Sequence, residues 1–124
     1  MNAKTANRDR NIYYLHKTFR KTEDIATKYG LKPNTIVKII KAMDKKVEER
    51  NQFVYQLCDY TKLNHSNLSA SFIYSALNKF IGSYEIYHKI FSKEDLINLI
   101  NTIRIRGIGP KLKAIINEFI ESTK

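Results

Sequence analysis

The fold of this chain is decided by residues 22–41, TEDIATKYGLKPNTIVKIIK, which read as two helices joined by a sharp turn. Thr22 and the two acidic residues after it place a capping oxygen and negative charge where a helix N-terminus favours both. Gly30 supplies the left-handed backbone that ends a helix, and Pro33 suits the first turn of the next one. The segment therefore predicts a helix-turn-helix unit.

The second helix of such a unit enters the DNA major groove with its N-terminal residues facing the base edges. Asn can pair with adenine, Lys with guanine or a phosphate, and Thr with either or with a thymine methyl group. The residues that this helix offers for DNA binding are Lys32, Asn34, Thr35, Lys38 and Lys41. A plain three-helix core without DNA contact remains the alternative.

The pattern DIA…YGL…NTI resembles the helix-turn-helix of primary sigma factor region four and of related bacterial regulators, over about residues 10–45. The resemblance implies that this part of the chain reads duplex DNA in a sequence-specific way. Some phage DNA-packaging proteins share the same pattern.

A second motif lies in residues 103–120, IRIRGIGPKLKAIINEFI, where GIGPK is typical of a helix-hairpin-helix. Its two glycines let the backbone turn and expose successive amides, which form an anion site together with the helix N-terminus behind them. Such a hairpin contacts the DNA backbone and carries little sequence information. The candidate phosphate-binding residues are Arg104, Arg106, Gly107, Ile108, Gly109, Lys111 and Lys113.

The wider segment, about residues 67–119, resembles the C-terminal domain of the RNA polymerase alpha subunit. The matching pieces are LSASFIYSAL (68–77), SKEDLI (92–97) and RGIGPK (106–111). The resemblance implies minor-groove DNA binding and contacts with transcription factors. Phe72 stands where that family usually carries its main DNA-contacting Arg, so docking on a protein is the alternative role of this domain.

Between the two motifs, no Gly or Pro interrupts residues 34–60, which predicts one long helix. Its apolar stripe steps by four and three and has one polar member; it consists of Ile36, Ile40, Met43, Val47, Arg50, Val54 and Leu57. We expect this stripe to pack within the chain. A homodimer through the long helix is the alternative.

The helix boundaries in the second half are marked by local signals. Ser92 and Asp95 read as a capping box, and Pro110 opens the last helix. Residues 84–91 read as a short helical turn. The predicted protein is thus all-α, with a flexible tail (1–9), a helix-turn-helix unit (10–50), a linker helix and break (51–66) and a helix-hairpin-helix domain (67–124).

The composition favours a polyanionic partner. The chain has 22 basic and 12 acidic residues, a net charge of +10, and both halves are basic: +6 for residues 1–60 and +4 for residues 61–124. We therefore expect double-stranded DNA as a partner; a lysine-rich solvated surface is the alternative. Only four Gly and two Pro in 124 residues argue against a turn-rich all-β fold.

Several functional classes are disfavoured. Cys58 is the only cysteine, and the histidines lack metal-ligand spacing. No carboxylate pair suits a two-metal nuclease, and GIGPK is too short for a Walker loop. No apolar stretch could span a membrane, and the N-terminus does not resemble a secretory signal. We therefore expect a cytoplasmic protein without cofactor, metal or enzymatic activity.

These observations predict a sequence-specific, double-stranded DNA-binding transcriptional regulator of a bacterium or phage that contacts RNA polymerase. One alternative is a DNA replication, recombination or packaging accessory factor, which would bind branched or single-stranded DNA. The other is an inhibitor that binds polymerase and does not bind DNA.

Overall fold

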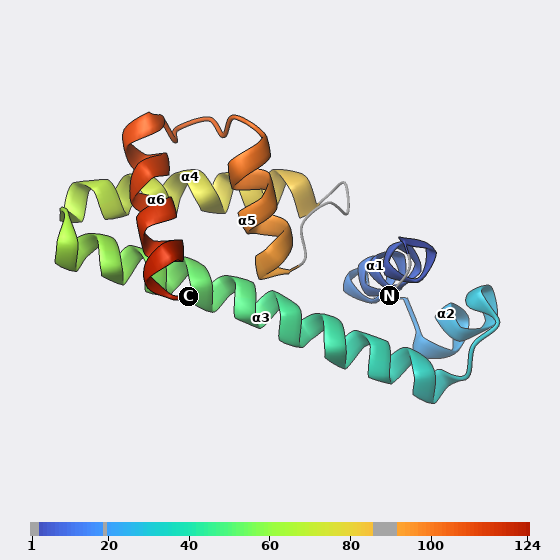
Figure 1. The fold of residues 1–124 in the computed structure, drawn as a ribbon. Coiled ribbons are helices and arrows are strands. Elements are labelled where there is room, and N and C mark those ends of the chain that lie inside the picture. Colours follow the sequence, from blue (N-terminus) through green and yellow to red (C-terminus); the bar gives the residue numbers. More distant parts are fainter. Residues whose placement is uncertain (1–2, 19, 86–91) are drawn as a thin grey trace. The chain divides into compact units, whose positions relative to one another are not determined.

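The computed structural model in Figure 1 describes residues 3–18, 20–85 and 92–124. Over these residues the protein is all-α, as the sequence predicts, and contains no strand. The helices are α1 (Ala3–Lys17), α2 (Thr22–Tyr29), α3 (Pro33–Asn64), α4 (Asn67–Glu85), α5 (Lys93–Thr102) and α6 (Pro110–Ser122). The helical turn predicted at residues 84–91 lies outside the described residues from position 86 onward.

The chain forms two compact units, Met1–Glu48 and Glu49–Lys124, and α3 contributes to both. The first unit has 12 basic and 5 acidic residues, a net charge of +7, whereas the second has 10 and 7, a net charge of +3. Each unit builds its own apolar core, and each contains one of the two motifs.

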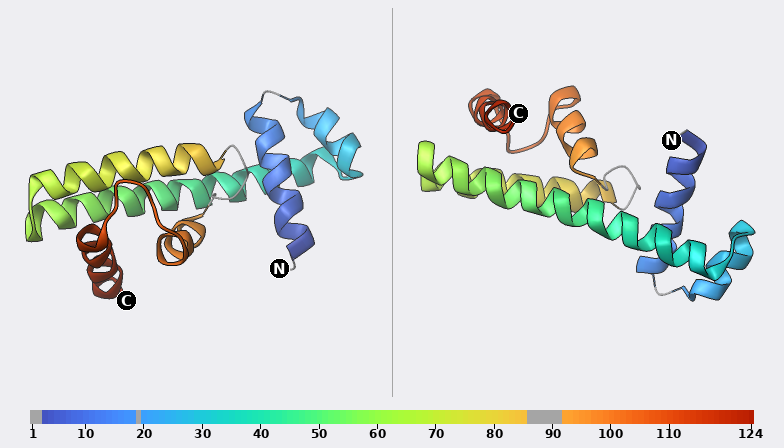
Figure 2. Two further views of the ribbon diagram at one scale, coloured as in Figure 1. Left: turned by 90° about the horizontal axis from the view of Figure 1, so that it is seen from above. Right: turned by 60° about the horizontal axis from the view of Figure 1, so that its bottom comes forward.

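In the first unit, α1, α2 and the start of α3 enclose a small core (Figure 2). The phenol of Tyr13 on α1 donates a hydrogen bond of 2.5 Å to the carboxylate of Asp44 on α3. The buried apolar side chains are Ile12, Tyr13, Ile25, Ala26, Ile36, Ile40 and Met43.

The turn between α2 and α3 has the predicted glycine stop. Gly30 adopts a left-handed conformation, with φ +64°. The Leu31 N–H donates to the Ala26 carbonyl at 3.0 Å and the Gly30 N–H donates to Thr27 at 3.3 Å, which is the Schellman pattern. Pro33 is the first residue of α3, as expected. The predicted cap at Thr22 is wrong: Lys21 is the N-cap, and its side chain makes no capping hydrogen bond.

In the second unit, the C-terminal part of α3 lies beside α4, and α5 and α6 cross one face of this helix pair (Figures 1 and 2). Aromatic packing joins the two layers, with the ring centroids of Phe53 and Phe119 5.6 Å apart. The core includes Phe53, Leu57, Ile73, Leu77, Leu96, Ile100, Ile116 and Phe119.

The boundaries predicted at both ends of the helix-turn-helix unit differ from the structure. Residues 3–9, expected as a tail, belong to α1. The range 51–66, expected as a linker and break, instead contains the C-terminal part of α3, which runs on to Asn64 and contributes Phe53, Val54, Leu57 and Cys58 to the core of the second unit. Thr61 is buried there, and its hydroxyl donates to the Leu57 carbonyl at 2.8 Å. This bond satisfies the hydroxyl inside its own helix, so the polar run does not break the helix.

The apolar stripe of α3 packs within the chain. Its members are buried by residues of this molecule, except for half-buried Val47. The stripe is therefore not a free surface through which a homodimer could form.

Local capping fixes the starts of α4 and α5. The Ser69 N–H donates to the Ser66 hydroxyl at 3.0 Å. Ser92 and Asp95 form the predicted capping box: the Asp95 N–H donates to Ser92 Oγ at 3.1 Å, and the Ser92 N–H donates to Asp95 Oδ2 at 3.2 Å. Pro110 opens α6 as expected.

Candidate nucleic-acid interface

The predicted recognition residues lie at the start of α3, and most of them face solvent. Asn34, Lys38 and Lys41 are exposed, and their spacing of four and three residues places them on one face of the helix. Lys32 is exposed just before the helix, where its carbonyl accepts the Ile36 N–H at 3.2 Å. Thr35 is half-buried at the edge of this face. We call Lys32, Asn34, Thr35, Lys38 and Lys41 the α3 face.

An apolar side chain that the sequence analysis did not select also lies on this face. Val37 is 39% exposed, whereas its neighbours Ile36 and Ile40 are buried. Val37 lies three residues after Asn34 and four before Lys41, and residues at these spacings share a helix face. This periodicity could have identified Val37 from the sequence. An exposed aliphatic group beside an amide and ammonium groups complements the major groove, where thymine presents a methyl group next to hydrogen-bonding base edges.

The predicted hairpin connects α5 and α6 in the second unit. The Ile108 N–H donates to the Ile105 carbonyl at 3.0 Å. Gly107, the third residue of this turn, has φ +91°, as a type II turn requires. The side chains of Ile105 and Ile108 are buried and anchor the hairpin in the core.

The two hairpin glycines have different surroundings. A Cβ atom on Gly107 would lie 3.2 Å from the Cβ of Ala76 on α4. A Cβ atom on Gly109 would meet nothing within 4 Å, and Gly109 has an ordinary φ of −84°. The turn therefore requires glycine only at position 107, while Gly109 leaves the backbone open to an approaching group.

One predicted phosphate donor is already used by the turn. Because the Ile108 amide donates to Ile105, it is not available to an anion, and Ile108 contributes an anchoring side chain instead. The donors that remain are the amides of Gly109, Lys111 and Leu112, because Pro110 has no N–H and the Lys113 N–H already donates to the Gly109 carbonyl at 3.0 Å. Beside them, Arg104, Gly109 and half-buried Lys113 line a cavity of about 590 Å³.

A second cavity, of about 680 Å³, lies between α4 and the hairpin and is called the α4 groove below. Its lining residues include Phe72, Ser75, Ala76, Lys79, Phe80, Ser83, Arg104, Arg106 and Gly107. Lys79 was not among the residues predicted from the sequence. Its spacing of four residues from Ser75 and seven from Phe72 was the available signal, because it places the three on one face of α4.

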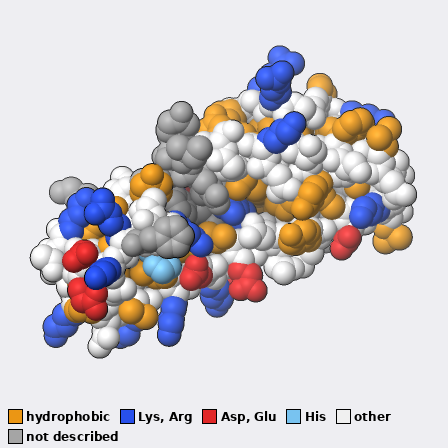
Figure 3. Space-filling model, turned by 180° about the vertical axis from the view of Figure 1, so that it is seen from behind, with side chains coloured by type: hydrophobic (Ala, Val, Ile, Leu, Met, Phe, Trp, Pro, Cys, Tyr) orange, Lys and Arg blue, Asp and Glu red, His pale blue; other side chains and the backbone are white. Residues whose placement is uncertain are grey.

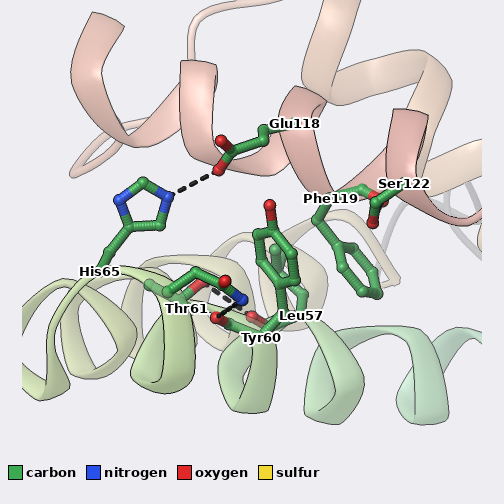
Figure 4. Close-up of polar contacts among 8 residues, drawn as sticks. Leu57, Tyr60, Thr61, His65, Glu118, Phe119 and Ser122 are labelled. Atoms are coloured by element: carbon green, nitrogen blue, oxygen red, sulfur yellow. Dashed lines mark hydrogen bonds and ion pairs between the residues drawn. The ribbon is translucent and has the colours of Figure 1, made fainter.

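Lys111 lies apart from both cavities. It is exposed and lines a smaller hollow of about 260 Å³ with His65 and Glu118. Figure 4 shows His65 Nε2 and Glu118 Oε2, which are 2.6 Å apart. The structure thus distributes the predicted hairpin cations over different surfaces: Arg104 lines both cavities, Arg106 lines the α4 groove and Lys113 lines the cavity at Gly109.

The groups with shifted pKa values line neither the α4 groove nor the cavity at Gly109. Hydrogen bonds from His65 and then Tyr60 lower the pKa of Glu118, against an opposing effect of burial. Desolvation raises the pKa of Tyr60, and its hydrogen bond to Glu118 adds to the shift. Burial also raises the pKa of Cys58, against the attraction of Lys62. A raised thiol pKa disfavours the nucleophilic thiolate, so Cys58 is a core residue.

Among the described residues, no group of three or more His, Cys, Asp or Glu side chains could hold a metal ion. His88, one of the histidines considered in the sequence, lies outside the described residues. No helix in residues 3–18, 20–85 and 92–124 combines the length and the apolar character needed to cross a membrane.

The chain matches no protein-family model, and comparison with curated proteins and with solved structures finds no match either. The likenesses to sigma factor region four and to the alpha-subunit domain therefore rest on the residues quoted above.

Proposed function

We propose that this protein is a sequence-specific, double-stranded DNA-binding transcriptional regulator. The α3 face reads base edges in the major groove, and the hairpin of the second unit binds backbone phosphates. A contact with RNA polymerase completes the proposal and rests on the likeness to two polymerase-associated domains alone.

The observation that carries the proposal is the exposure of Asn34, Val37 and Lys38 on one face of α3. A buried or charge-neutralised face would not suit DNA. This face follows a sharp glycine turn in the chain and presents an amide, an aliphatic group and an ammonium group. Such groups distinguish base pairs in the major groove. The net charge of +7 on the first unit favours the same partner.

The hairpin supports a second, sequence-independent contact. Its open backbone at Gly109 and the cations Arg104 and Lys113 border one cavity. Contacts of this kind position a protein on DNA without reading its sequence. The proposed division of labour is therefore that the first unit selects the site and the second adds affinity.

Selection of bound duplexes from a random pool tests the proposal. We expect enrichment of a defined sequence by the full chain, and a loss of discrimination of roughly 1–3 kcal/mol in the Asn34→Ala variant at the position it reads. The Lys38→Ala variant should lose discrimination in the same way. Its matched control is Lys62→Ala, since Lys62 is an exposed lysine of the same helix outside the proposed face. It should leave the enriched sequence unchanged.

The alternatives give different outcomes in the same assays. A replication, recombination or packaging factor would prefer a junction to a duplex and would enrich no sequence. A polymerase-binding inhibitor would show no salt-dependent DNA binding. If the Asn34→Ala and Lys38→Ala variants keep both affinity and base preference, α3 is not the reading helix.

A further inference from the structure

The α4 groove combines an exposed aromatic ring with several cations. Phe72 is 54% exposed although it lines a cavity of about 680 Å³. Lys79, Arg104 and Arg106 line the same cavity and are exposed. Ligand sites in proteins have volumes of about 300–1,000 Å³, so the groove has room for a small molecule or for one residue of a polymer.

The floor of the groove is apolar and belongs to the core. Ala76, Phe80 and Ile105 are buried there. Gly107 brings the hairpin backbone against Ala76, as the 3.2 Å distance to its absent Cβ shows. The groove thus presents an apolar floor beneath a cationic rim, which complements a flat group that carries negative charge.

The described residues do not neutralise the cations on the rim. No ion pair joins Lys79, Arg104 or Arg106 to an acidic side chain in the part of the chain that the structure describes. Clustered like charges repel each other, so a polyanion such as a chain of phosphodiester groups would be bound favourably. Arg104 lines this groove and also the cavity at Gly109, which joins the rim to the hairpin amides.

Apolar side chains are also exposed elsewhere on this unit. Tyr55, Leu63, Leu68 and Tyr74 lie on α3 and α4, and Figure 3 shows apolar patches on the surface of the unit, with cations near its upper edge. Of these side chains, Phe72 is the one that lines any of the three cavities described above, and its cavity also contains cations. This combination separates it from the remaining surface.

We infer that the α4 groove binds an unpaired nucleotide of a single-stranded nucleic acid, with its base stacked on Phe72 and its phosphates held by Lys79, Arg104 and Arg106. Stacking on an aromatic ring together with a positively charged path is how proteins bind single strands. In a duplex, neighbouring base pairs cover both faces of each base, so Phe72 finds no face to stack on. The inference goes beyond the proposed function, because it needs neither the α3 face nor a duplex.

A tryptophan reporter tests the stacking directly. The chain contains no Trp, so Phe72→Trp introduces the only one. We expect its emission to be quenched by an oligothymidylate or an oligouridylate at lower concentrations than by a mixed-sequence duplex. Both oligomers present unpaired bases and phosphates, and a difference between their affinities shows that the groove responds to the 2′-hydroxyl or to the thymine methyl group, by which the two differ. A duplex that quenches as effectively as both single strands overturns the inference.

The Phe72→Ala variant measures how much the stacking contributes to the affinity for a single strand. Loss of one stacked base should weaken single-strand binding roughly 5- to 100-fold and leave duplex binding unchanged. Tyr55→Ala is the matched control, since Tyr55 is equally exposed at 53% and lies outside the groove; it should bind both probes as the wild type does. Because Phe72 is half-exposed, the urea midpoint of the variant should stay near that of the wild type.

Three results would refute the groove as a single-strand site. These are equal losses for single strand and duplex, no loss for either, and no binding of a single strand by the wild type. The last would favour a protein partner for Phe72. The proposed function fails on a different readout, the absence of any preferred duplex sequence, so the two can be rejected independently.

Discussion

Gly107 and Gly109 stand two residues apart in one hairpin, and their surroundings predict different consequences of the same substitution. Gly107→Ala would place a side chain at φ +91° and 3.2 Å from the Cβ of Ala76. Left-handed strain at a non-glycine residue costs of order 1–3 kcal/mol, and the contact adds to it. We expect the free energy of unfolding, measured by urea denaturation, to fall by about this amount.

Gly109→Ala should separate binding from folding. Its φ of −84° suits any residue and its Cβ would meet nothing within 4 Å, so we expect a change in stability below about 1 kcal/mol. The added methyl group occupies the open side of the hairpin backbone, so the affinity for any duplex should fall. Unchanged affinity in an electrophoretic titration would show that phosphates do not approach the backbone here.

Glu118 makes the stability of the second unit depend on pH. Hydrogen bonds from His65 and Tyr60 hold its pKa below the ordinary value in the folded state, and Figure 4 shows the contact with His65. The stabilisation is present above the pKa of the unfolded chain, about 4.3 for Glu, and is lost as the pH falls through the lower folded value. We expect the wild type to be more stable than Glu118→Gln at neutral pH, and the difference to shrink as urea midpoints are measured at increasingly acidic pH.

The matched control is Glu121→Gln. Glu121 forms an exposed ion pair with Lys124 at 2.9 Å, and such pairs contribute little. The effect of Glu121→Gln on the urea midpoint should be small at every pH. A Glu118→Gln variant that loses nothing at neutral pH would contradict the assignment of the lowered pKa to a stabilising contact.

At the scale of the helix, caps decide where elements begin. Ser92→Ala removes the hydroxyl that accepts the Asp95 N–H at 3.1 Å, and loss of such a cap costs about 1 kcal/mol. Ser83→Ala is the control, because its hydroxyl donates to the Lys79 carbonyl inside α4 and caps nothing. We expect Ser92→Ala to lower the thermal midpoint clearly more than Ser83→Ala; equal shifts would show that the capping box does not stabilise α5.

The elements that could be predicted from sequence are those with local signals. Gly30, Pro33, Ser92 and Pro110 mark helix ends through backbone conformation or capping within a few residues, and the structure has ends at each of them. Thr61 shows where this reasoning stops. Its polar neighbours suggest a break, yet its hydroxyl bonds inside the helix and its side chain is covered by the core, which depends on contacts distant in sequence.

In the candidate site, too, some features could be predicted from local sequence patterns and others could not. The exposure of Lys38 and Lys41 follows from helix periodicity, and the same periodicity places Val37 beside them. Residue types alone did not predict that the turn uses the Ile108 amide. They also did not predict that Lys79 and Arg106 line the same cavity. Both depend on how the hairpin folds back on itself and on α4, which is fixed by Gly107 packing against Ala76.

At the scale of the whole molecule, the proposal that both units contact DNA predicts how affinity responds to salt. Each phosphate contact contributes roughly 0.9 to the slope of log affinity against log salt concentration. Lys38→Ala and Lys113→Ala remove one cation from each unit, and effects at independent sites add. The double variant should therefore lose roughly twice as much slope as either single variant, or about 1.8 in total for two phosphate contacts.

The control for this measurement is Lys62→Ala combined with Lys124→Ala, which removes the same charge from surfaces outside both proposed contacts. If net charge alone attracted DNA, this pair would reduce the slope as much as Lys38→Ala with Lys113→Ala, since long-range attraction depends on total charge. Site-specific contact predicts instead a slope near that of the wild type for the control. A reduction by Lys38→Ala without one by Lys113→Ala would confine DNA contact to the first unit and leave the hairpin to another ligand.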